Sequence, residues 1–312
     1  MSTPANGEDC RRRTQARSAG IAKSRRPGLP SASEASEDKR GSTVLGLGEN
    51  MNTANASLSQ SRWRYFLLAT VAIGSLALML ASPPIGQDLE YHGFADRRAF
   101  FGIPNFWNVV SNIPFLLVGI AGLRFCLGHE LRSGRSAWIA LFAGVALVSV
   151  GSSYYHWDPR DATLVWDRLF ITIAFMGLFV ALLGEHLSAR LAHVLLVPML
   201  LVGLCSVLYW RAFGDLRLYL WVQLITLLAI PLLIVLFRAG YTRRSLLLAA
   251  LGWHALARVS ELYDREFFAL TGDLFSGHSF KHILAAIACF TILWMLRIRK
   301  PVQPAGAHLV QR

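Results

Sequence analysis

Long apolar runs alternate with short polar connections along most of this chain. A transmembrane helix needs roughly 20 consecutive, mainly apolar residues, and each run is about that long. The eight runs lie at residues 64–82, 106–126, 136–156, 164–184, 190–209, 217–237, 244–262 and 279–297. Because a helix satisfies its own backbone hydrogen bonds inside a bilayer, the pattern predicts an all-α fold, a polytopic membrane helix bundle.

The composition agrees with this prediction. Of 312 residues, 54% are hydrophobic and only 16% are charged, whereas soluble domains average about 45–50% and about 25%. The net charge of +12 would suit a nucleic-acid partner, but a dissolved basic domain would not contain such apolar runs. Cys10, Cys126, Cys205 and Cys289 lack the spacing of a metal motif, and we expect free thiols.

Residues 1–61 differ from the rest of the chain. They are rich in Arg, Ser, Gly and Pro, with few apolar side chains, and this predicts a disordered basic segment. Met51 begins "MNTANASLSQSRWRYFLL", a short basic lead into the first run, and we hypothesise that it is the natural start. The expected divisions are therefore 1–61, a first transmembrane helix with its connection at 62–89, a main membrane domain at 90–299, and a cytoplasmic tail at 300–312.

Basic and acidic residues alternate between successive connections. Lys and Arg are enriched in the cytoplasmic connections of membrane proteins. Every second connection is basic and contains Arg132, Arg135, Arg190, Arg238, Arg243 and Arg244. The intervening connections contain Asp88, Asp158, Asp161, Asp264, Glu266 and Asp273. This predicts that both termini lie in the cytoplasm, and we expect the membrane to be a bacterial inner membrane.

Five polar residues fall near the outer ends of three runs. "VGSSYYHWDP" places Ser152 and His156 four residues apart, on one face of a helix. "LVWDRLF" contains Asp167 at the start of the next run, and "SGHSFKHILAA" contains His278 and His282 at the start of the last. Three neutral imidazoles and a water complete a tetrahedral zinc site. We therefore expect zinc at His156, His278 and His282.

The two remaining residues suit a catalytic role beside such a site. Zinc lowers the pKa of its bound water to about 7. Asp167 would move protons, and Ser152 would donate a hydrogen bond to a developing oxyanion. Three alternatives stay open: Asp167 caps its helix, Ser152 bonds its own helix, and His156 is only an interhelical hydrogen-bond partner.

Two further polar patches lie inside the runs. His254, Arg258 and Glu261 share one face of the seventh run, where Arg258 and Glu261 are expected to form a structural ion pair. His254 is a rival metal ligand at greater depth. "GIPNFWNVVSNIPF" contains Asn105, Asn108, Ser111 and Asn112, and small polar side chains of this kind usually join helices.

Three stretches together resemble the alkaline ceramidase family. These are "PNFWNVVSN", "SSYYHWDPRDATLVWDRL" and "SGHSFKHI", and the family belongs to a superfamily of seven-helix membrane hydrolases that includes adiponectin-receptor-like proteins. The resemblance covers residues 90–298 and implies a seven-helix core, with the helix near 64–82 as an addition. It also implies zinc held by His156, His278 and His282, with Ser152 and Asp167 assisting amide hydrolysis.

The sequence also departs from that family. Its eukaryotic members have a calcium site whose last ligand, a glutamate, corresponds to Asn105 here. Asp88, Glu90 and Asp96 offer oxygen ligands, but calcium is not assigned. The substrate expected from the resemblance is ceramide or another N-acyl lipid, which would reach the site from the outer leaflet.

We therefore expect a zinc-dependent intramembrane hydrolase that converts an N-acyl lipid into a free fatty acid and an amine. One rival is a non-enzymatic receptor or sensor with a structural zinc site, in which all four ligands would be protein groups. Another is a haem protein that uses His278 or His282. A zinc protease is disfavoured, because the sequence contains no HExxH motif.

Overall fold

The computed structural model describes residues 62–131, 134–237 and 240–302, which belong to the unit Ser61–Arg312. Within these ranges every regular element is a helix, and the predicted all-α bundle is confirmed. The disorder predicted for residues 1–61, the hypothesis about Met51 and the tail beyond residue 302 concern residues outside the described ranges.

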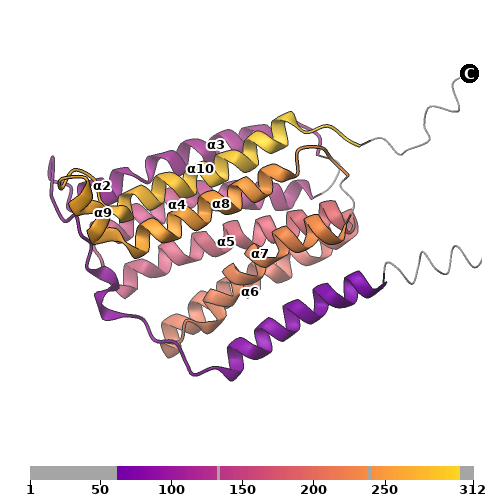
Figure 1. The fold of residues 1–312 in the computed structure, drawn as a ribbon, viewed down its shortest axis with the longest axis horizontal. Coiled ribbons are helices and arrows are strands. Elements are labelled where there is room, and N and C mark those ends of the chain that lie inside the picture. Colours follow the sequence, from indigo (N-terminus) through magenta and orange to yellow (C-terminus); the bar gives the residue numbers. More distant parts are fainter. Residues whose placement is uncertain (1–61, 132–133, 238–239, 303–312) are drawn as a thin grey trace, which may run out of the picture. The chain divides into compact units, whose positions relative to one another are not determined.

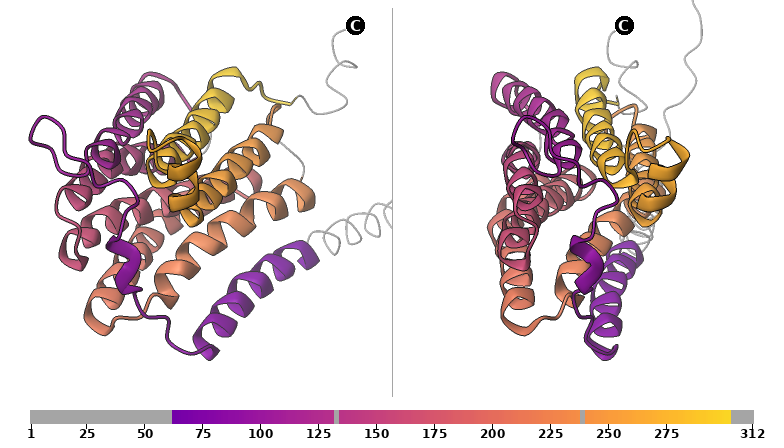
Figure 2. Two further views of the ribbon diagram at one scale, coloured as in Figure 1. Left: turned by 60° about the vertical axis from the view of Figure 1, so that its left-hand side comes forward. Right: turned by 90° about the vertical axis from the view of Figure 1, so that its left-hand side faces the viewer.

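The first helix is Arg62–Ala81, and the remaining elements follow in chain order (Figure 1). They are η1 (Leu89–His92), α2 (Phe106–Val110), α3 (Ile113–Gly128), α4 (Arg135–Trp157), α5 (Asp161–His186), α6 (Ala189–Phe213), α7 (Arg217–Leu236), α8 (Ser245–Leu262), α9 (Asp264–Leu270) and α10 (Gly277–Ile298). Helix α4 packs against α3 and α5, while α10 packs against α8 and α3 (Figures 1 and 2).

All eight predicted runs form helices, with three differences of detail. In the described part of the chain, seven helices are long and apolar enough to cross a membrane, which indicates a membrane-embedded protein. Helix α8 is not one of these seven helices, because His254, Arg258 and Glu261 lower its mean hydropathy. The second run is divided into α2 and α3 just before Pro114, which has no N–H to donate. The short helix α9 was not predicted.

Small residues allow close approach between the helices that bear the predicted site. A Cβ atom added to Gly144 of α4 would lie 2.5 Å from the backbone nitrogen of Ala174 in α5. A Cβ atom added to Gly277 would collide with the carbonyl oxygen of Ser260 in α8. These glycines let α4 pack closely on α5 and α10 begin directly against α8.

Polar contacts join the first helix and its connection to α7. The Trp221 Nε1–H group donates to Ser75 Oγ at 3.1 Å, and the Arg217 guanidinium donates to the carbonyl oxygen of Leu80 at 2.8 Å. Arg217 also donates to Asp215, and this hydrogen bond lowers the pKa of the Asp215 carboxyl below its ordinary value. No residue in the most apolar stretch of this helix is buried, so it lies at the periphery of its unit.

Candidate metal centre

Three histidines from two helices meet at one end of the bundle. His156 lies in the last turn of α4, and His278 and His282 lie in the first turns of α10. All three are buried, and one ring nitrogen of each lies within 4.8 Å of the other two. The predicted convergence is confirmed, and the cluster can hold a metal ion.

The spacing of the rings fits an ion bound among them. Nε2 of His156 and Nε2 of His282 are 3.3 Å apart, and two nitrogens of a tetrahedral site with bonds of about 2.0–2.1 Å lie about 3.3–3.4 Å apart. The three ring centroids are separated by 4.9, 4.9 and 5.1 Å. An interhelical hydrogen bond would use only two of these rings, whereas an ion would use all three.

Ser111 determines which nitrogen of His282 faces the cluster. Its hydroxyl oxygen lies 2.8 Å from Nδ1 of His282 and 3.3 Å from the carbonyl oxygen of Asn108, to which the hydroxyl donates. The hydroxyl therefore accepts from the His282 Nδ1–H group. This leaves the lone pair of Nε2 free to bind a metal, as in other sites where a second contact orients a ligand histidine.

Asn108 connects the segment around Ser111 to α10. It is fully buried, donates to the carbonyl oxygen of Asp96 at 3.1 Å and accepts from the Ser279 hydroxyl at 2.7 Å. The prediction that this patch joins helices is right for Asn108. It missed the role of Ser111, because no sequence spacing relates Ser111 to His282, 171 residues away.

The connection before α2 encloses the other two histidines. The Phe94 ring lies 4.8 Å from the rings of both His156 and His278, measured between centroids. Asp264 fixes this arrangement, since its carboxylate accepts from the backbone N–H groups of His278 at 2.6 Å and Ala95 at 2.9 Å. The cluster is thus shielded by an aromatic ring on the side of this connection.

Asp88, Asp96 and Asn105, from the segment compared with the calcium site, have other partners. Asp88 accepts from the backbone of Glu90 at 2.9 Å, and Asp96 is buried in an ion pair with Arg98 at 2.7 Å. Asn105 donates to the carbonyl oxygen of His156 at 2.8 Å. These contacts stabilise the connection before α2 and attach it to the end of α4. Calcium is not assigned to them.

Ser152 and Asp167 lie beside the cluster and face a cavity that His282 also lines. Both side chains are buried. Helix α5 begins at Asp161, with Arg160 as its N-cap. Asp167 lies more than one turn inside the helix, so the alternative that it caps the helix is wrong.

A chain of charges extends from the cluster along α8. The Lys281 ammonium group lies 3.0 Å from Nε2 of His278 and 2.8 Å from the Glu261 carboxylate. Glu261 also pairs with Arg258. The predicted Arg258–Glu261 pair is confirmed. The sequence analysis did not identify Lys281, which pairs with the same carboxylate and lies next to the histidine cluster.

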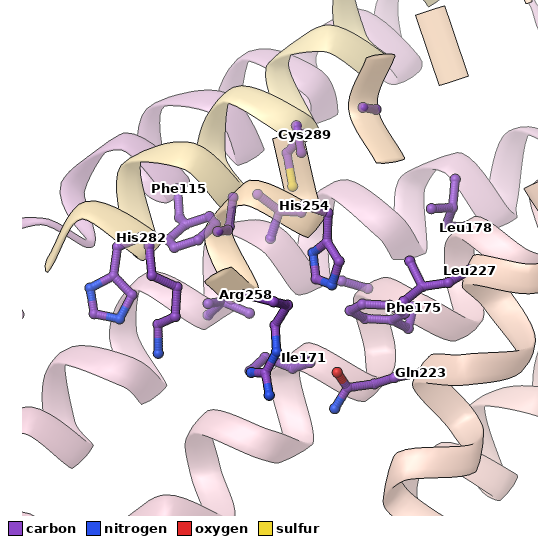
Figure 3. A pocket seen from close by; sticks show the side chains of 18 of the residues that line it. Phe115, Ile171, Phe175, Leu178, Gln223, Leu227, His254, Arg258, His282 and Cys289 are labelled. Carbon is purple, nitrogen blue, oxygen red and sulfur yellow. The ribbon is translucent and has the colours of Figure 1, made fainter. Parts of the chain in front are cut away.

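The cavity is polar at the cluster and becomes mainly apolar toward its far end (Figure 3). Its volume is about 180 Å³. Along α5 its lining changes from Asp167 to Ile171 and Leu178, and along α10 from His282 to Cys289 and Ile292. One end therefore suits a polar group, and the other suits a hydrocarbon chain.

His254 lines this cavity and lies outside the metal cluster. Its ring packs edge-on against Phe175, with 5.6 Å between centroids. The prediction that ranked His254 below the other three histidines agrees with this placement.

Comparison with known proteins assigns no family to the chain. No protein-family model matches it, and no curated protein matches it significantly.

Proposed function

We propose that this protein is a zinc-dependent intramembrane hydrolase that cleaves the amide bond of an N-acyl lipid, ceramide or a ceramide-like molecule, to a free fatty acid and an amine. The observation that supports this most directly is the shared cavity. His282, Ser152 and Asp167 line one end, while the opposite end is apolar.

The donor set favours zinc in a catalytic role. Three neutral imidazoles with a fourth position open to water are typical of catalytic zinc, whereas structural sites have four protein ligands. The cluster found among the described residues has three. When bound, zinc would polarise the substrate carbonyl and lower the pKa of a water molecule.

The protein's own residues would orient the substrate and move its protons. Asp167 would accept a proton from the attacking water and return it to the leaving amine. Ser152 would stabilise negative charge on the carbonyl oxygen. The acyl chain would lie in the apolar end of the cavity, which excludes water from it.

The two rival functions receive less support. A sensor with a structural zinc would require a fourth protein ligand at the cluster. Haem would need room for a porphyrin beside the histidine, yet the three imidazole centroids are only 4.9–5.1 Å apart. The resemblance of the short motifs to alkaline ceramidases adds to the proposal.

We also propose that the lipid reaches the cavity from the outer leaflet of a bacterial inner membrane.

The proposal is tested by removing and restoring the metal. The purified protein should contain about one zinc per chain and release fatty acid from N-acyl lipids of a membrane extract. Chelation should abolish the release, and stoichiometric zinc should restore it. Bound zinc without any amide hydrolysis across the lipid extract would favour the sensor, and a haem absorption band would favour the haem protein.

A further inference from the structure

Two polar side chains lie in the part of the cavity beyond the metal cluster. Gln223 of α7 and His254 of α8 both line the cavity and point into it (Figure 3). Their neighbours there are mainly apolar, among them Ile171, Phe175 and Leu227. Neither side chain forms a hydrogen bond with another residue in the described part of the chain.

Unpaired polar groups in such surroundings are costly. A polar group without a hydrogen-bond partner is unfavourable in an apolar environment, and the half-buried side chains of Gln223 and His254 turn this unused capacity toward the cavity; polar residues inside membrane helices usually face a functional cavity. An apolar side chain at position 223 or 254 would fill the same space without this cost. The two groups are therefore best explained by a partner that the cavity admits.

The order of residues along each helix gives their depth. One turn of helix is about 5.4 Å long. Along α7 the lining proceeds from Tyr219 at the cluster end to Gln223 and then Leu227, and along α8 from Arg258 to His254 and then to an apolar stretch. Both unpaired groups thus lie about one turn beyond the polar end and before the apolar end.

We infer that Gln223 and His254, with the guanidinium of Arg258 beside them, form a second polar subsite that binds an oxygen-bearing group on the acyl chain of the substrate. An amide and an imidazole each donate and accept hydrogen bonds, and a hydroxyl group on the chain matches both. This inference rests on the proposed function in taking the occupant to be a lipid acyl chain. A plain chain would leave the two groups unpaired, so the subsite would discriminate against it.

The test uses the zinc-loaded full-length protein and a set of N-hexadecanoyl amides of one amine. One member is unsubstituted, and the others have a single hydroxyl group at successive carbons. We expect kcat/KM at one hydroxyl position to exceed that of the unsubstituted amide by about tenfold, as one additional buried hydrogen bond would give. Gln223→Leu and His254→Leu should remove this preference, whereas the control Leu227→Met, one turn deeper on α7, should retain it.

A binding measurement separates the subsite from the hydrolase. The matching hydroxyhexadecanoic acid should raise the melting temperature of the wild-type protein more than hexadecanoic acid does, and His254→Leu should abolish the difference. Amide hydrolysis that is indifferent to hydroxyl position would overturn the subsite and leave the hydrolase standing. No hydrolysis, with the melting difference retained, would overturn the hydrolase and support the subsite; no hydrolysis and no difference would overturn both.

Discussion

The hydroxyl oxygen of Ser111 lies 2.8 Å from Nδ1 of His282, on the side of the imidazole away from the histidine cluster. Because this hydroxyl donates to the carbonyl oxygen of Asn108, it accepts the proton of Nδ1. The contact selects one tautomer of His282 and directs the lone pair of Nε2 toward His156.

Ser111→Ala should therefore weaken metal binding without removing a ligand. Loss of the contact that orients a metal-bound histidine typically costs about 10–100-fold in affinity. Competition with a chromophoric chelator would measure this. Ser153→Ala is the matched control, because the Ser153 hydroxyl donates to the carbonyl oxygen of Val109 at 3.2 Å and forms no hydrogen bond to the histidine cluster within the described residues. Equal affinities for the two variants would contradict the proposed role of Ser111.

Alanine at His156, His278 or His282 should each remove most of the bound zinc, since each offers one of the three clustered nitrogens. His254→Ala should keep the metal, because His254 lies outside the cluster. Zinc content per chain, measured by elemental analysis on protein purified under identical conditions, tests both statements. Zinc lost from His254→Ala but retained in His156→Ala would mean that the ligand set is wrong.

Asp167→Asn should separate catalysis from metal binding. The substitution keeps the shape of the side chain and removes its basicity, so turnover should fall by about 10²–10⁴-fold while zinc content stays near one per chain. Ser152→Ala should cost about 10²–10³-fold, as loss of one oxyanion donor does in other hydrolases. Turnover and zinc content are measured on the same preparations. Near-normal turnover of Asp167→Asn would exclude it as the proton carrier.

Glu261 should matter more for stability than either of its cationic partners. It pairs with both Lys281 and Arg258, whereas each cation has only Glu261 as a carboxylate partner within the ion pairs of the described residues. Glu261→Gln leaves the part-buried Lys281 ammonium group without a carboxylate partner, and loss of a hydrogen bond to a charged group costs about 1.5–3 kcal/mol. Lys281→Met should cost less, because Glu261 keeps Arg258. Melting temperatures in one detergent compare the two, and a larger loss in Lys281→Met would contradict this ordering.

The orientation in the membrane can be tested at two connections on opposite sides. In a chain with Cys10, Cys126, Cys205 and Cys289 replaced by alanine, Arg160→Cys should react with an impermeant thiol reagent added to intact spheroplasts. Arg190→Cys, exposed in the first turn of α6 next to the following connection, should react only after lysis. The reverse pattern would place the metal cluster at the cytoplasmic face.

The sequence by itself determined the helices and the membership of the histidine cluster. An apolar run of about 20 residues has few alternatives to a helix in a bilayer, because every backbone group must be paired internally. Short connections then force successive helices to reverse direction, which brings the end of α4 and the start of α10 to the same side. His156, His278 and His282 could thus be grouped before any contact was known.

Only the tertiary structure decided which side chains surround that cluster. The break before Pro114 separates α2 from α3 and directs Ser111 toward His282, and the rotation of α8 about its own axis directs His254 and Glu261 into the cavity. Local sequence patterns specify which residues share a face of a helix, but the direction of that face depends on packing against other helices. The close contacts at Gly144 and Gly277 are part of that packing, and they join segments far apart in the chain.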